Sequence, residues 1–123
     1  MCGFAGLLGR PPGDFASRVI PRLAHRGPDD HGIWQSESAC LVHRRLAILD
    51  LSSIGHQPMK SSCGRWQLVF NGEIYNHDEL RLELQQDGLT FRGRGDTEVL
   101  LALMSLRGVD GIRRLRGLSL IHI

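Results

Sequence analysis

Short apolar runs divided by glycine, proline and polar residues predict an alternation of strands and helices along the chain. The apolar run at residues 3–9 predicts a buried strand whose glycines allow other backbone to come close. Asp14 follows a Pro-Pro-Gly break and is placed to cap a short helix. Residues 33–35 and 39–48 predict two strands joined by a Ser-Glu-Ser turn, so the sheet is at least partly antiparallel. Another strand is expected at residues 66–70.

Two longer helices are predicted in the C-terminal half of the chain. Residues 76–79 have the spacing of a capping box, and the helix that they open should stop at Gly88. A second helix should be capped by Asp96 or Thr97 and end before Gly108. The pattern therefore predicts a chain of mixed strands and helices with most of its strands in the first half, and it does not by itself select a fold.

The length and charge of the chain restrict its class. Its 123 residues suit one domain, which can bury roughly two-thirds of the surface that the unfolded form exposes. The net charge of +2 is too small to favour a nucleic-acid partner. No stretch approaches the length of a membrane span, and the apolar start is too short for a secretion signal. A late arginine cluster is interpreted as a solvated helical face, with a phosphate or RNA site as the alternative: Arg107, Arg113, Arg114 and Arg116.

Cysteine and histidine spacing argues against metal sites. Cys2, Cys40 and Cys63 are an odd number of cysteines with no CxxC pair, so neither a zinc knuckle nor a disulfide framework is expected. The six histidines contain no HxH or HxxxH pair, so no metal site is predicted. Free thiols indicate a reducing, cytoplasmic setting.

The candidate chemistry begins at the second residue. Removal of Met1 is expected because the next side chain is small, and it leaves Cys2 with both a thiol and a free α-amine. A thiol of pKa near ~8.5 can give its proton to an amine of pKa about 7.7–8.0 through a short contact or one water. One residue would then supply nucleophile and base. A cysteine without function at this position is the alternative.

Three further polar positions are candidates for substrate contacts. Arg45 shares a predicted strand face with His43, Ala47 and Leu49, which predicts that it is partly buried. A partly buried arginine needs an anion, which is either the α-carboxylate of an amino acid or an internal Asp or Glu. Asn71 and Gly72 follow a predicted strand and suit either a hairpin turn with positive φ or two convergent donors of an oxyanion hole. Asp96 suits either a plain helix cap or an acceptor for a substrate ammonium.

Six motifs occur in an order and spacing that resemble one family. They are the Met-Cys-Gly start and residues 25–29, 43–50, 56–59, 71–77 and 95–98. Over residues 1–117 the chain resembles the glutaminase domain of glutamine-hydrolysing asparagine synthetases, which are class II, N-terminal-nucleophile glutamine amidotransferases. The resemblance implies an α+β fold, the αββα four-layer sandwich of the N-terminal-nucleophile (Ntn) hydrolases, of which only the N-terminal part is expected here.

The resemblance also implies a role for each matching residue. Cys2 resembles the nucleophile, its amine the base, and Asn71 with Gly72 the oxyanion hole. Arg45 and the backbone after it would hold the α-carboxylate of glutamine, while Glu73 and Asp96 would hold the α-amino end. The glutamine-binding residues implied are Arg45, Leu46, Ala47, Ile48, Leu49, Asn71, Gly72, Glu73 and Asp96. Attack on the γ-carboxamide would release ammonia, and water would then cleave a glutamyl thioester.

The resemblance sets the expected scope of the activity. Residues 118–123 do not resemble the family, and the chain is expected to be a truncated domain whose hydrolysis of L-glutamine is weak, because missing strands would leave a sheet edge open. ATP and Mg²⁺ would act in an absent synthetase domain that amidates aspartate to asparagine, and no cofactor is expected in this chain. A homodimer is implied, without nucleic-acid or membrane partners. Amidation of another carboxylate and a non-catalytic binding role stay open as alternatives.

Overall fold

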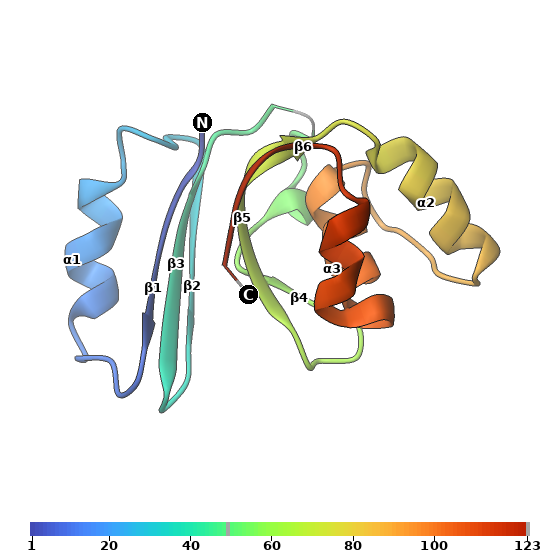
Figure 1. The fold of residues 1–123 in the computed structure, drawn as a ribbon. Coiled ribbons are helices and arrows are strands. Elements are labelled where there is room, and N and C mark those ends of the chain that lie inside the picture. Colours follow the sequence, from blue (N-terminus) through green and yellow to red (C-terminus); the bar gives the residue numbers. More distant parts are fainter. Residues whose placement is uncertain (49, 123) are drawn as a thin grey trace.

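The computed structural model describes residues 1–48 and 50–122 and contains two antiparallel sheets flanked by helices (Figure 1). One sheet has the strand order β1-β3-β2 and the other β4-β5-β6. The strands are β1 (Gly3–Leu8), β2 (Asp30–Gln35), β3 (Ala39–Arg45), β4 (Met59–Lys60), β5 (Gln67–Ile74) and β6 (Gly117–His122). The helices are α1 (Phe15–Arg22), α2 (His77–Gln86) and α3 (Asp96–Arg107), with 3₁₀ turns η1 (Ser53–Gly55) and η2 (Gly108–Arg114). The α+β class and the antiparallel pairing are confirmed.

The first sheet is built around the predicted hairpin. β2 and β3 pair antiparallel, and β1 pairs with the other edge of β3. Cys40 and Val42 lie on one face of β3 and pack against Ala16 of α1, which lies on the outer side of this sheet in Figure 1. β3 ends at Arg45, earlier than expected, because the Ala47 amide donates to the Asp29 carboxylate (2.8 Å) instead of continuing the ladder.

The second sheet carries the larger apolar core. β5 runs along its middle, and α3 packs against it with α2 beside α3 (Figure 1). The helix pattern is the predicted one, since Leu80 and Leu84 turn the inner face of α2 to the core and Gly88 ends the helix with a φ of 88°. The buried apolar residues are Met59, Leu68, Phe70, Ile74, Leu80, Leu84, Val99, Leu100, Leu101, Leu103 and Met104. This core fixes β5 and the start of α3 relative to each other.

The turn expected at Asn71 and Gly72 is absent, and this alternative is wrong. β5 continues through both residues to Ile74 because β6 pairs with it over the same stretch. Among the described residues, positive φ occurs only at Gly9, Gly64, Gly88 and Gly108. Asn71 and Gly72 are therefore residues within a strand and not in a turn.

The expected helix caps are also corrected. Asp14 and Asn76 precede α1 and α2 but make no capping hydrogen bond, and Asp96 is the first residue of α3 rather than its cap. The Asp14 carboxylate pairs with Arg18 instead (3.4 Å), while the Asn76 side chain bonds the backbone of the η2–β6 connection. The side chains of Asp14 and Asn76 thus bond other partners. Their residue types correctly predicted where the two helices start, although neither side chain caps its helix.

His43 joins the two sheets. Its ring is fully buried, and Nε2 lies 3.1 Å from the carbonyl oxygen of Phe70 in β5. Nδ1 has no hydrogen-bond partner among the described residues. Burial, which disfavours the charged ring, lowers the pKa of His43 to about 4. The neutral ring is thus part of the contact between the sheets.

Candidate functional site

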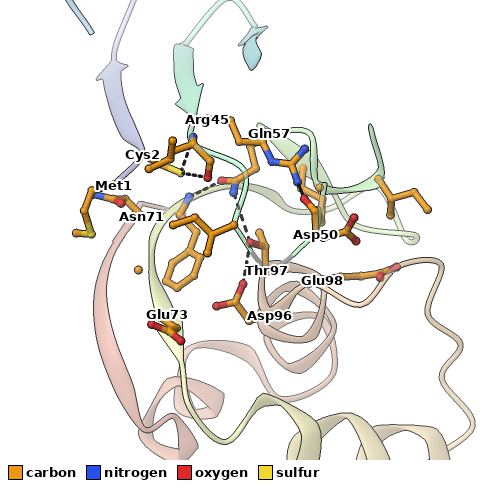
Figure 2. A pocket seen from close by; sticks show the side chains of 18 of the residues that line it. Met1, Cys2, Arg45, Asp50, Gln57, Asn71, Glu73, Asp96, Thr97 and Glu98 are labelled. Carbon is orange, nitrogen blue, oxygen red and sulfur yellow. Dashed lines mark hydrogen bonds between the residues drawn. The ribbon is translucent and has the colours of Figure 1, made fainter. Parts of the chain in front are cut away.

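A small cavity lies where the chain start, the end of β3, the middle of β5 and the start of α3 meet (Figure 2). Its volume is about 160 Å³. Pockets for drug-sized ligands usually enclose roughly 300–1,000 Å³, so this one suits a smaller molecule. Its lining residues are Met1, Cys2, Arg45, Leu46, Ile48, Asp50, Ile54, Gly55, Gln57, Met59, Phe70, Asn71, Gly72, Glu73, Tyr75, Gly95, Asp96, Thr97 and Glu98.

Cys2 stands at the edge of the cavity, just before β1. Its Sγ accepts a hydrogen bond from the Leu46 amide (3.3 Å) and lies 3.6 Å from the Leu46 carbonyl oxygen. The backbone on the other side is held as well, because Arg26 Nε donates to the Cys2 carbonyl (3.3 Å). The thiol is half-buried and oriented toward the cavity by a residue that follows β3.

Arg45 supplies a fixed positive charge. The side chain is 8% exposed, and its guanidinium donates to the carbonyl oxygens of Ser52 (2.8 Å) and Asp50. Within the described ranges, Arg45 has no carboxylate oxygen within 4 Å, so the internal ion pair considered from the sequence is not present there. A cation fixed by neutral carbonyls can still bind an anion with its remaining N–H groups.

The loop that holds Arg45 is itself ordered by Asp50. The Asp50 carboxylate accepts hydrogen bonds from the amide and hydroxyl of Ser52 (2.8 and 2.6 Å) and from the Arg94 amide (3.2 Å). The hydrogen bond from the Ser52 hydroxyl is the main cause that holds the pKa of Asp50 below its usual value, and the charge of Arg45 adds to it. This role of Asp50 was not predicted from the sequence, because the donors come from two separate loops.

β5 contributes three consecutive positions. Asn71 is 5% exposed, Gly72 is half-buried and Glu73 is exposed, and all three line the cavity. Asn71 carries a side-chain amide at this wall, and such a group can donate hydrogen bonds. Glu73 brings a carboxylate to the same wall (Figure 2).

Asp96 places a second carboxylate at the start of α3. It is 6% exposed, and Oδ2 accepts a hydrogen bond from the Ile74 amide (3.0 Å) while Oδ1 accepts one from the Thr97 hydroxyl (3.4 Å). The positive end of the α3 dipole favours a negative charge here. A carboxylate has about four acceptor positions, so this group keeps room for another donor. In Figure 2 Asp96 and Glu73 lie toward one end of the cavity and Cys2 and Arg45 toward the other.

Among the described residues, one of the expected glutamine-binding positions does not line the cavity. Ala47 is absent from the lining, and its amide is already bound to Asp29. Leu49 lies outside the described residues. The other expected residues all line the same cavity, although they are distributed over half of the chain.

Several lining residues were missed as individual candidates. Gln57 and Thr97 lie inside the motifs at 56–59 and 95–98, so the motifs could have indicated them. They were missed because the residue type of a single polar position does not by itself predict a role. Tyr75 is largely exposed and forms an apolar part of the rim.

The described residues contain neither a candidate metal site nor a candidate membrane-spanning helix. No group of three His, Cys, Asp or Glu side chains there could hold a metal ion. None of the helices in that part of the chain is both long enough and apolar enough to cross a membrane.

Comparison with known proteins gives a consistent match. A family model described as a glutamine amidotransferase domain matches residues 1–123. Asparagine synthetase [glutamine-hydrolyzing] 1 of Bacillus subtilis is 37% identical over 96% of this chain, and the enzyme of the same name from Arabidopsis thaliana is 40% identical over 96%. A probable asparagine synthetase of Dictyostelium discoideum is 44% identical over 83%. The aligned part is 20% of the first two relatives and 18% of the third, so the chain spans about a fifth of the relatives' length.

Proposed function

Because the chain belongs to the glutamine amidotransferase domain family, we propose that its cavity binds L-glutamine and releases the amide nitrogen as ammonia. The observation that carries the proposal is the convergence in one cavity of a half-buried thiol, a fixed arginine and a buried carboxylate. These groups match the γ-amide, the α-carboxylate and the α-ammonium of a free amino acid.

The charges at the site support free glutamine over glutamine within a peptide. Arg45 offers donors to a carboxylate, and Asp96 and Glu73 offer acceptors to an ammonium. A peptide lacks both terminal charges at an internal residue, so Arg45 and the two carboxylates of the site would be left without partners. The small volume of about 160 Å³ favours the same choice.

The proposed reaction begins with Cys2. With Met1 attached, the nitrogen of Cys2 is in a peptide bond, so removal of Met1 supplies the basic amine and opens one part of the lining. The amine takes the thiol proton, and the sulfur attacks the γ-carboxamide carbon. The Asn71 side chain and the Gly72 amide would donate to the oxyanion of the tetrahedral intermediate. Its C–N bond then breaks as the amine protonates the departing ammonia, and water hydrolyses the remaining thioester to glutamate.

The wider proposal concerns the protein to which such a domain contributes. The relatives are named asparagine synthetases, and we propose that the ammonia serves amidation of aspartate with ATP and Mg²⁺ in a synthetase domain. The two-sheet arrangement with outer helices supports an αββα sandwich of the Ntn-hydrolase type. A homodimer and a cytoplasmic setting belong to the same proposal.

The test compares cysteine variants of the chain with Met1 removed, as verified by mass spectrometry. Cys2→Ala should abolish release of ammonia from L-glutamine and labelling by a glutamine-like diazo ketone, because no other thiol lines the cavity within the described residues. Cys63→Ala is the matched control, since Cys63 is exposed and lies outside the cavity, and it should keep both properties. A preparation that retains Met1 should be inactive. Unchanged ammonia release in Cys2→Ala would refute the proposal.

A further inference from the structure

The edge of β5 that faces the cavity is not covered by a full neighbouring strand. β4 has only two residues and pairs with Gln67 and Leu68, so the edge is open beyond that point. The opposite edge pairs with β6, and the Tyr75 amide donates in that direction to the carbonyl of Arg116 (2.7 Å). Amide directions alternate along a strand, so the amides of Phe70, Gly72 and Ile74 share the open edge.

Side chains take the place of the missing strand at two of these amides. The Phe70 amide donates to Oε1 of Gln57 (2.7 Å), and the Ile74 amide donates to Oδ2 of Asp96 (3.0 Å). Both acceptor residues are buried. The Gly72 amide lies between the two and has no side-chain acceptor in the described part of the chain. Gln57 and Asp96 therefore bind the amides on either side of Gly72 and leave the Gly72 amide available as a donor at the cavity.

The two acceptors are joined by a hydrogen-bond chain with a fixed direction. A backbone amide only donates, so Oε1 of Gln57 must face Phe70 and Nε2 must face Thr97 (3.4 Å). Nε2 only donates as well, so the Thr97 hydroxyl accepts from it and directs its own hydrogen to Oδ1 of Asp96 (3.4 Å). The amide of Phe70 thus sets the orientation of each group. Figure 2 shows Gln57, Thr97 and Asp96 joined in this order by hydrogen bonds.

We propose that Gln57 and Thr97 are positioning residues that hold both ends of the substrate site together. Gln57 fixes the β5 edge so that the Gly72 amide points at the developing oxyanion. Thr97 fixes the Asp96 carboxylate so that its remaining acceptor positions face the substrate ammonium. The inference deepens the proposed function and rests on it.

The test separates the two ends with two substrates, L-glutamine and its analogue without the α-amino group. Thr97→Val should lower kcat/KM for L-glutamine about tenfold, the factor that corresponds to about 1.4 kcal/mol, and should change that of the analogue little. Thr97→Ser should restore the value, because it keeps the hydroxyl. Gln57→Met should lower kcat about tenfold for both substrates, because the oxyanion donor loses its support.

A second substitution at Gln57 tests the inference where Gln57→Met destabilises the fold. Gln57→Glu keeps the shape and the acceptor for Phe70 but cannot donate to Thr97 when ionised, so it should behave like Thr97→Val. Equal losses for both substrates in Thr97→Val and Thr97→Ser would overturn the inference, as would wild-type kinetics in both Gln57 variants. An unmodified chain that does not react with glutamine would instead refute the proposed function, and the inference with it.

Discussion

The position of the Arg45 side chain depends on the absence of a side chain at Gly55. A Cβ built on Gly55 would overlap the guanidinium of Arg45, which passes directly over this residue. The arginine can therefore reach the carbonyls of Asp50 and Ser52 only because residue 55 is glycine. The position of the Arg45 guanidinium thus depends on a residue that has no side chain.

Gly55→Ala should displace the Arg45 guanidinium and raise KM for glutamine about tenfold, since one charge-assisted contact would be lost. Steady-state kinetics with the Met1-free chain measures the effect. Gly13→Ala is the matched control, because a Cβ there meets nothing within 4 Å, and it should leave KM unchanged. Identical KM values in both variants would show that Arg45 does not bind the α-carboxylate of the substrate.

Among the elements, the start of α2 is joined to the end of η2 and to the η2–β6 connection through the side chain of Asn76. Asn76 Nδ2 donates to the carbonyl of Arg114 (3.0 Å), and its Oδ1 accepts from the Arg116 amide (2.9 Å). Glu83 of α2 adds ion pairs with Arg107 and Arg114 on the surface. Two members of the arginine cluster thus connect elements, in addition to lying on a solvated face.

Asn76→Ala should lower the free energy of unfolding by about 1–2 kcal/mol, because it leaves a backbone donor and a backbone acceptor without this partner. Urea unfolding followed by circular dichroism gives the value. Gln86→Ala, at an exposed position near the end of α2, should change stability by less than about 0.5 kcal/mol. An Asn76→Ala variant as stable as this control would mean that the two hydrogen bonds contribute nothing net.

At the scale of the whole molecule, the two sheets meet through a buried histidine. His43 on β3 reaches Phe70 on β5, and the charged groups that act on it are Asp30, Arg45 and His56. Burial keeps its pKa at about 4, below the unperturbed value of 6.5. Between these two values the unfolded chain binds a proton that the folded chain does not, so stability rises with pH across this window.

Lowering the pH from about 7 to about 4.5 should therefore destabilise the protein by about 2–3 kcal/mol through His43 alone. The contribution is the difference between wild type and His43→Gln, whose side chain does not titrate, in urea unfolding at the two pH values. Below about pH 4 both states are protonated and the difference should become constant. Parallel pH profiles for the two proteins would show that the ring is not held neutral by its burial.

Several predictions from local sequence patterns were confirmed by the fold. The β2–β3 hairpin, the inner face of α2 and the glycine stops at Gly88 and Gly108 were confirmed, because each depends on neighbouring residues and on side-chain alternation. The family resemblance was confirmed by a domain model that matches residues 1–123, since contiguous motifs survive in order along a chain. The roles of the individual site residues stay predictions.

The sequence by itself determined the three helices, the strands β1, β2, β3 and β5, the presence of both α and β structure and the family, because these follow from the spacing of residues and the order of motifs along the chain. Only the tertiary structure decided that Asn71 and Gly72 continue a strand, that Asn76 bonds the η2–β6 connection instead of capping a helix, and that Gln57 and Asp96 occupy the open edge of β5. Each of these depends on a backbone group far away in the sequence. A polar side chain bonds whichever unpaired backbone group the fold brings within reach, and its neighbours in the chain do not reveal which one that is.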